Sequence, residues 1–316
     1  MPIFFQILTR SILPLLLTLQ FGCQTLHRHV AEDEPVFPDW VIYDGVTGGE
    51  ISWNQMVGSV LSSQIILVGE RHDDAIAHEL EQRLVEELLA GFPNSAVTME
   101  MFERDEQVFL DLFLAQAIDS DALAATTDVR GWGGEENWRL WYLPIVESVR
   151  DRVPEGATLL AANSPRSYVR LSRFAGHQVL SEIDQNTLLP LFAIPRDDVD
   201  EETYRTRFFE MMGGHAVAGK EEGEGLDIES FFRAQQVWDA TMAESVRMAL
   251  AKHPKVLLIA GDFHIAQNGG VLQRLRHLDP FPVISTISIR PVEDPTSFRT
   301  EDAERADFVI YTRADT

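Results

Sequence analysis

Two apolar segments of this chain end in the same way, with a glycine, an acidic residue and a histidine in close succession. Residues 65–72 read IILVGERH, and residues 256–264 read VLLIAGDFH. A short run of branched apolar residues that ends in a glycine is typical of a strand buried on both faces of a parallel sheet. Ligands of such sheets bind beyond the carboxyl ends of the strands. The two segments therefore predict a parallel sheet whose carboxyl edge carries acids and histidines from two strands.

The rest of the chain alternates between strand and helix patterns. Strands are predicted at residues 96–99, 157–162, 282–289 and 308–311, and helices at residues 75–89, 143–149 and 228–250. This alternation indicates parallel βα units with right-handed crossovers. Residues 166–252 lack a clear buried strand. We therefore predict an α/β protein with a mainly parallel sheet flanked by helices, consisting of a core (residues 40–165 and 253–316) and an inserted smaller helical lobe (166–252).

The chain is strongly acidic. Its 26 Lys and Arg residues against 50 Asp and Glu residues give a formal net charge of −24. Because such a chain repels phosphate backbones, we expect no nucleic-acid partner. Hydrophobic residues make up 45% of the sequence, which is enough to form a large core and argues against disorder of the whole chain.

The N-terminal segment differs from the rest of the chain. Arg10 is the only charge in residues 1–22, which are rich in leucine, and this pattern is typical of a secretory signal peptide too short to span a bilayer. Cys23, the single cysteine, follows directly, at a position that resembles the lipobox of bacterial lipoproteins. We expect lipidation at Cys23 and a tether over residues 23–39. The predicted location is that of an exported, membrane-anchored lipoprotein, on the periplasmic side or at the cell surface.

Acids and imidazoles gather at the predicted strand ends. The candidate site consists of Glu70, His72, Glu100 and His264, with a second group around them, namely His78, Glu103, Arg104 and Asp262. Carboxylates and imidazoles are ligands for divalent metal ions, and the same pair carries out general acid and base catalysis. The sequence alone does not separate these uses. No Gly-x-Ser-x-Gly or Walker motif occurs, which argues against acyl-enzyme or nucleotide-dependent chemistry.

Each of these residues also has a plain structural interpretation. Glu70 could cap the helix that follows it, and Arg104 could form an ion pair with Glu100 or Glu103. The joint placement of polar groups at several strand ends favours a shared site over these separate roles.

Five groups of short motifs are spread over residues 50–290. They are Gly69–His72 with His78, then Met99–Arg104, then Ala161–Arg166, then Ala234-Gln235 with Trp238-Asp239 and Met242-Ala243, and finally Gly261–His264 with Gly269-Gly270. In their order and spacing, these motifs resemble the ChaN family of haem-binding lipoproteins. That family is part of a wider superfamily that includes Tiki proteins and erythromycin esterases.

The resemblance implies a parallel α/β core with a smaller helical lobe, a lipid anchor, and haem bound between two protomers through a tyrosine ligand. It further implies His and Lys side chains that hold the haem propionates. Tyr168 and Tyr204 lie in the predicted lobe and are the candidate haem ligands, with His215 and Lys220 as further candidate haem-binding residues. Tyr142 lies among aromatic residues and is expected to be a packing residue. The implied partners are haem, a second copy of the chain, the membrane, and an outer-membrane haem transport system.

Three functions stay open from the sequence. The first is a lipid-anchored haem-binding protein of iron or haem uptake or storage, with haem at a dimer interface. The second is a metal-dependent hydrolase in which Glu70, His72, Glu100 and His264 hold a divalent ion or activate a water molecule. The third is a scaffold whose polar strand ends satisfy helix N-termini.

Overall fold

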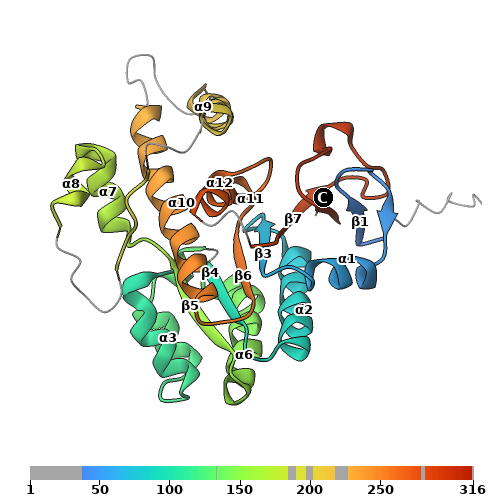
Figure 1. Ribbon diagram of the computed structural model, residues 1–316, viewed down its shortest axis with the longest axis horizontal. Helices are drawn as coiled ribbons and strands as arrows, with labels where there is room; N and C mark the ends of the chain where they lie inside the picture. The colour runs from blue at the N-terminus through green and yellow to red at the C-terminus, as the bar shows by residue number, and fades with distance from the viewer. Residues whose placement is uncertain are drawn as a thin grey trace, which may run out of the picture. The chain divides into compact units, whose positions relative to one another are not determined.

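The computed structural model describes residues 38–132, 134–183, 190–196, 202–217, 227–278 and 282–314, with side chains described for all of these except 214–217 and 278. In this part of the chain, eight strands form one sheet in the order β2-β1-β8-β7-β3-β6-β4-β5 (Figure 1). The strands are β1 (Trp40–Asp44), β2 (Glu50–Ile51), β3 (Ile65–Glu70), β4 (Ala96–Glu103), β5 (Thr158–Asn163), β6 (Val256–Gly261), β7 (Ile284–Val292) and β8 (Phe308–Arg313).

The strand directions confirm the predicted α/β class. Strand β3 pairs in parallel with β6 and β7, β4 pairs in parallel with β5 and β6, and β7 pairs in parallel with β8. Only β1 is antiparallel to its neighbours, β2 and β8. The carboxyl ends of β3, β4, β5, β6 and β7 therefore lie at one edge of the sheet.

Helices cover both faces of the sheet. The α-helices are α1 (Trp53–Val60), α2 (Ala75–Gly91), α3 (Gln107–Leu114), α4 (Ser120–Thr126), α5 (Gly134–Asn137), α6 (Leu143–Arg152), α7 (Arg166–Ala175), α8 (Gln178–Ser181), α9 (Glu202–Val217), α10 (Ile228–Leu250), α11 (Asp262–Ile265) and α12 (Gly270–Leu278). Short 3-10 turns occur at η1 (Arg104–Glu106), η2 (Val129–Trp132), η4 (Val153–Glu155) and η5 (Thr300–Asp302), and a π-helical turn at η3 (Trp138–Tyr142).

The core has two layers because successive strand residues point to opposite faces. Ile66 and Val68 of β3 belong to the cluster that packs against α1, α2, α3 and α6. Ile65 and Leu67 belong to the cluster that packs against α10 and α12. All six residues of β3 and of β6 are buried. Burial on both faces explains why these strands read as unbroken apolar runs.

Strand β4 is longer than the sequence analysis predicted. The strand pattern predicted residues 96–99, whereas the strand continues to Glu103 with Met101 and Phe102 buried. Its pairing with β5 shifts register between Met99 and Glu103. Glu100 lies in this stretch of the strand, and its carboxylate accepts a hydrogen bond from the Gly261 amide at the end of β6.

The segment predicted as an inserted lobe contains helices α7 to α10. Val169 of α7 and Leu180 of α8 pack on the first half of α10. The second half of α10 packs on the sheet itself through Met242 and Val246. No helix in the described ranges has both the length and the apolar composition needed to cross a bilayer.

The free edge of β5 is covered by a side chain. The Gln107 amide donates to the Leu159 carbonyl at 3.1 Å and accepts from the Ala161 amide at 2.8 Å. Gln107 thus occupies the backbone groups that a further strand would use. Covering an edge in this way is a known protection against association between sheets.

We predict that Gly69→Ala destabilises the protein. A Cβ at Gly69 would lie 2.6 Å from Oδ1 and 2.9 Å from Cα of Asp262, so the backbone of α11 would have to move away from β3. The expected loss is about 1–3 kcal/mol in the free energy of unfolding. Urea denaturation followed by circular dichroism measures it.

Gly58→Ala is the matched control for this substitution. Gly58 lies on the exposed side of α1 with no atom near its Cβ position, and alanine there should stabilise the helix by about 0.5–1 kcal/mol. Equal unfolding free energies for the two variants would contradict the close packing of β3 against α11.

Candidate functional site

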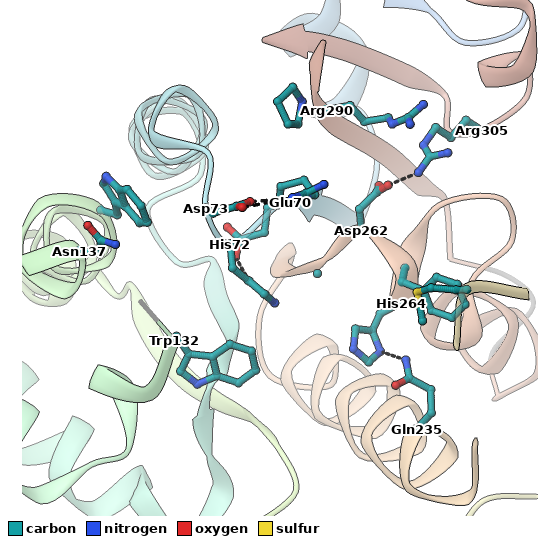
Figure 2. Close-up of a pocket in the computed structure, with 16 residues that line it drawn as sticks. Glu70, His72, Asp73, Trp132, Asn137, Gln235, Asp262, His264, Arg290 and Arg305 are labelled. Atoms are coloured by element: carbon teal, nitrogen blue, oxygen red, sulfur yellow. Dashed lines mark hydrogen bonds and ion pairs between the residues drawn. The ribbon is translucent and has the colours of Figure 1, made fainter. Parts of the chain in front are cut away.

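A cavity of about 700 Å³ lies at the carboxyl ends of β3, β6 and β7 (Figure 2). It is lined by the polar residues Glu70, Arg71, His72, Asp73, Asn137, Gln235, Asp262, His264, Arg290 and Arg305, by the apolar residues Trp132, Trp141, Met211, Phe263 and Pro291, and by Gly261. The cavity is at the edge where the sequence analysis expected it. Residues from segments that the sequence analysis did not connect also line the cavity.

The β3 end of the cavity is built around the buried carboxylate of Glu70. Glu70 Oε1 lies 2.6 Å from His72 Nδ1 and accepts a hydrogen bond of 3.0 Å from the Tyr142 hydroxyl. Glu70 Oε2 lies 3.2 Å from His78 Nδ1. Burial opposes ionisation, but the hydrogen bonds from His72 and His78 outweigh it and hold the pKa of Glu70 below its ordinary value. Glu70 is therefore a permanent anion behind His72.

A second acid lies behind Glu70. Glu81 Oε2 is 3.0 Å from His78 Nδ1, and both residues are buried. Burial and the nearby charge of Glu70 raise the pKa of Glu81. Burial also opposes the charged form of His78, but the two carboxylates outweigh it and raise the pKa of His78 to about 10. Among the described residues, Glu70, His78 and Glu81 alone form a group with the spacing of metal ligands.

The opposite wall carries His264 between two carboxylates. Its Nδ1 lies 2.6 Å from Asp239 Oδ1, and its Nε2 lies 3.3 Å from Glu100 Oε1. Burial opposes the charged form, but these two acids outweigh it and raise the pKa of His264 to about 10. Tyr204 donates to Asp239 Oδ2 at 2.9 Å and accepts from Gln235 Nε2 at 2.9 Å. His264 is thus held as an imidazolium, with both ring nitrogens engaged.

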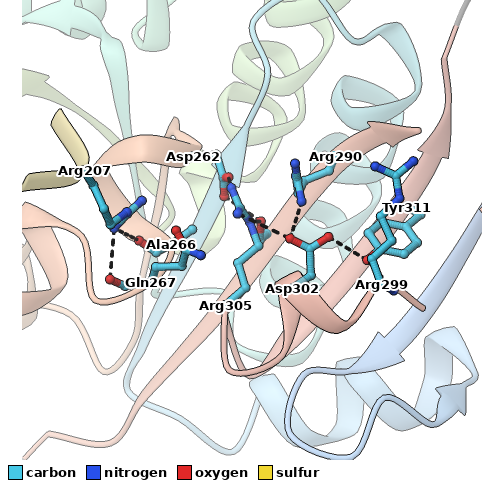
Figure 3. A network of polar contacts seen from close by, with 10 residues as sticks. Arg207, Asp262, Ala266, Gln267, Arg290, Arg299, Asp302, Arg305 and Tyr311 are labelled. Atoms are coloured by element: carbon cyan, nitrogen blue, oxygen red, sulfur yellow. Dashed lines mark hydrogen bonds and ion pairs between the residues drawn. The ribbon is translucent and has the colours of Figure 1, made fainter. Parts of the chain in front are cut away.

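The third side of the cavity is formed by arginines (Figure 3). Arg305 forms an ion pair with Asp262 and donates through Nε to Ser288 at 2.9 Å. Arg290 forms an ion pair with Asp302, which also accepts from the Tyr311 hydroxyl at 2.6 Å. Each of these guanidinium groups is therefore paired with an aspartate.

Aromatic side chains separate these polar groups. The Trp132 ring lies edge-on to His72 with centroids 4.9 Å apart, and Trp141 stacks on His78 at 5.0 Å. Phe263 and Met211 contribute apolar surface on the side of α9 and α11. The cavity therefore combines broad apolar walls with two imidazoles and a side of arginines paired with aspartates.

Several predicted site residues lie away from the cavity. Arg104 is buried and donates to the Thr241 carbonyl at 2.9 Å and to Glu244 at 3.1 Å, so it joins β4 to α10 and pairs with neither Glu100 nor Glu103. Glu103 accepts from the Arg166 amide at 3.0 Å at the start of α7. Both residues hold helices in position.

The tyrosines named as candidate haem ligands do not line the cavity. Tyr168 packs against Phe192 with ring centroids 4.8 Å apart, and Tyr204 is buried behind His264. The expectation that Tyr142 only packs was incomplete, because its buried hydroxyl donates to Glu70. His215 lies in α9, with its side chain outside the described residues, and Lys220 and Cys23 also lie outside them.

The sequence analysis gave no role to Asp239, Arg290, Arg305, Trp132 or Trp141. Arg290 had a usable signal, since it directly follows the strand predicted at residues 282–289. Asp239 had appeared only as part of a motif. The remaining three residues lie in turns or helices with no local pattern that points to a site.

This chain is similar to several solved structures. The solved structure of cofacial heme binding to ChaN of Campylobacter jejuni matches 87% of this chain and 98% of its own, with a TM-score of 0.61 and 21% identity. The type III effector HopBA1 matches 82% of this chain and 92% of its own (TM-score 0.45, 15% identity). An erythromycin esterase EreC mutant in its open conformation matches 88% of this chain and 84% of its own (TM-score 0.40, 13% identity). A search among curated proteins finds no match.

The fold, the strand-end motifs and the sequence agree on one family. The family model described as "Haem-binding uptake, Tiki superfamily, ChaN" matches residues 56–275, which span β3 to α12 and both walls of the cavity. This chain therefore belongs to the ChaN family of haem-binding uptake proteins in the Tiki superfamily.

Proposed function

We propose that this protein binds haem in the cavity at the carboxyl edge of the sheet and serves the uptake or storage of haem or iron. The observation that carries the proposal is the combination of aromatic walls and an arginine side in one cavity. Membership in a haem-binding uptake family agrees with it.

The cavity meets the chemical requirements of haem. A porphyrin is flat and apolar and carries two propionate groups at one edge. Trp132, Trp141 and Phe263 offer apolar surface for the ring, and Arg290 and Arg305 offer guanidinium donors for carboxylates. Its volume of about 700 Å³ is within the usual range for cofactor sites. When bound, haem would supply an iron centre that takes an axial ligand from the protein.

The proposal includes a haem site shared by two copies of the chain. Leu140, next to the cavity residue Trp141, is 62% exposed, and Met211, which lines the cavity, is 38% exposed. Exposed apolar residues beside a cavity suit a surface that a partner covers. Cofacial heme binding in the Campylobacter jejuni protein agrees with such a shared site.

We also propose that the protein is exported, lipidated at Cys23 and held at a membrane, where it would exchange haem with an outer-membrane transport system. The support is the sequence of the N-terminal segment, with its leucine-rich residues 1–22 followed by the single cysteine.

A metal-dependent hydrolase is the second candidate. The specific observation in its favour is that the Glu70–His72 pair and the Glu100–His264–Asp239 chain flank the same cavity. Against it, the pKa of about 10 for His264 leaves this imidazole protonated at neutral pH, so it cannot accept a proton there. The four predicted metal ligands also form two separate pairs, Glu70 with His72 and Glu100 with His264. Among the described residues, these four do not form a group with the spacing of metal ligands.

The purified full-length protein should bind haemin saturably. Titration with haemin, followed by absorbance in the Soret region, should give a shifted band that reaches a plateau at a fixed stoichiometry. Unsaturable, unshifted absorbance would exclude the haem function and leave the hydrolase candidate, to be tested by metal analysis and ester hydrolysis.

Arg290→Ala should weaken haemin binding by about tenfold, because one charge-assisted pair with a carboxylate is worth roughly 1.5 kcal/mol. Binding of the haemin dimethyl ester, which lacks propionate charges, should change little. Competitive Soret titrations measure both affinities. Arg152→Ala is the matched control, since Arg152 pairs with Glu155 on the surface and does not line the cavity. An equal loss for haemin and its ester would argue against propionate recognition by Arg290.

Leu140→Glu should reduce haem-dependent dimerisation and leave the fold intact, because the side chain is exposed. Sedimentation velocity of the haemin-loaded protein should show dimers for the wild type and mostly monomers for the variant. Val46→Glu, at a residue that is 70% exposed and outside the cavity, is the control. A haemin-loaded wild type that stays monomeric would rule out the shared site.

A further inference from the structure

We propose that one side of α7 docks on a membrane surface that contains anionic lipids. This outer face of α7 consists of Ser167, Arg170, Leu171 and Phe174, and Arg173 lies beside it. The proposal goes beyond the haem site. It rests on the proposed membrane location only in naming a bilayer as the partner.

The outer face of α7 lies opposite the side that packs on the protein. Val169 belongs to the apolar cluster that α7 shares with the first half of α10, and Ser172 is fully buried. Because successive helix residues are about 100° apart, Arg170, Leu171 and Phe174 share one sector on the other side. Phe174 is 77% exposed, more than any other large apolar side chain described. In Figure 1, α7 lies on the outer side of α10.

The charge of this segment differs from that of the rest of the chain. The protein has 50 acids in 316 residues, yet residues 156–181 contain no Asp or Glu and three arginines, Arg166, Arg170 and Arg173. Arg166 forms an ion pair with Asp128. Among the described residues, neither Arg170 nor Arg173 has a carboxylate partner. These two guanidinium groups therefore differ from those at the cavity, which are paired with aspartates.

The acids at the start of α10, the helix beside α7, are bound to other arginines. Asp227 lies 3.7 Å from Arg233, and Glu229 forms an ion pair with Arg205. Neither acid neutralises the outer face of α7.

Arg173 is held by aromatic rings and a hydroxyl group. Its guanidinium carbon lies 3.5 Å from the ring centroid of Phe231 and 5.3 Å from that of Phe174, and Nε donates to Ser230 Oγ at 3.4 Å. A guanidinium group that stacks on aromatic rings keeps its full charge. Arg173 is thus fixed next to the most exposed aromatic ring while its charge stays available to an anion.

Exposed aromatic and aliphatic side chains among unpaired arginines are typical of helices that lie in a membrane interface. Such helices place Phe and Leu at the boundary between headgroups and acyl chains, and their arginines bind lipid phosphates through two parallel hydrogen bonds. Acids elsewhere on the protein interfere little, because at 0.1 M salt charges are screened beyond about 10 Å. The outer face of α7 thus fits an anionic bilayer.

The test is co-sedimentation of the purified full-length protein with vesicles of phosphatidylcholine, alone or mixed with phosphatidylglycerol. A chain with a net charge of −24 should avoid the anionic vesicles unless a local cationic surface contacts them. We expect binding to the mixed vesicles to be tighter by about fivefold or more, since each arginine at an anionic surface contributes about that factor. High salt should remove the preference.

Arg170→Glu should abolish the preference for anionic vesicles. Phe174→Ser should weaken binding to both kinds of vesicle by about tenfold, because the ring no longer enters the interface. Both side chains are exposed and none of α7 lines the cavity, so the fold and haemin binding should be unchanged. The matched controls are Arg152→Glu, which changes an exposed arginine paired with Glu155, and Val283→Ser, which changes a residue that is 57% exposed.

Photo-crosslinking identifies the partner directly. The photoreactive residue p-benzoylphenylalanine in place of Phe174 should capture lipid, whereas the same residue in place of Val283 should not. Equal binding to both kinds of vesicle, or capture of a second copy of the chain by residue 174, would overturn the docking of α7 on a membrane. Haemin titration of the same samples tests the haem function separately, so either proposal can fail without the other.

Discussion

The parallel pairing of β3 with β6 is the constraint on which the site depends. The two strands are in register from Ile65 and Val256 to Glu70 and Gly261, with all their residues buried. Because side chains alternate between faces, a slip of one residue would turn Glu70 away from His78 and Tyr142. The same register sets Gly69 against Asp262, a contact that admits no side chain at residue 69. The positions of both histidines follow from this pair of strands.

Burial of so many charged groups requires that each has a partner. An unpaired charge in the interior is far less stable than one in water, and removing one member of a buried pair strongly destabilises a fold. Here the acids and imidazoles form two networks, one around Glu70 and His78 and one around His264, which meet at the cavity. The arginine side forms a third (Figure 3). The networks hold the cavity walls in a defined geometry.

The sequence analysis was most accurate for the bounds of helices and strands, which depend on residues that are close together in the chain. The helix at residues 228–250 has the predicted bounds, and the strands at residues 65 and 256 begin where the apolar runs begin. The prediction was less complete for long-range contacts. Arg104 was assigned to nearby acids but reaches α10, where it donates to the Thr241 carbonyl. Asp239, 25 residues from His264, became part of the site only through the packing of α10 beside α11.

The sequence by itself determined the α/β class, the six strands from β3 to β8, and the presence of acids and histidines at the carboxyl edge, whereas β1 and β2 were not predicted. Periodicity and turn residues carry that information because they report burial along the chain. Only the tertiary structure decided which histidine is enclosed by two acids. It alone brought Arg290, Arg305 and the tryptophans to the same cavity. Such contacts depend on strand register and helix packing, and these bring together residues that are far apart in the sequence and carry no local pattern.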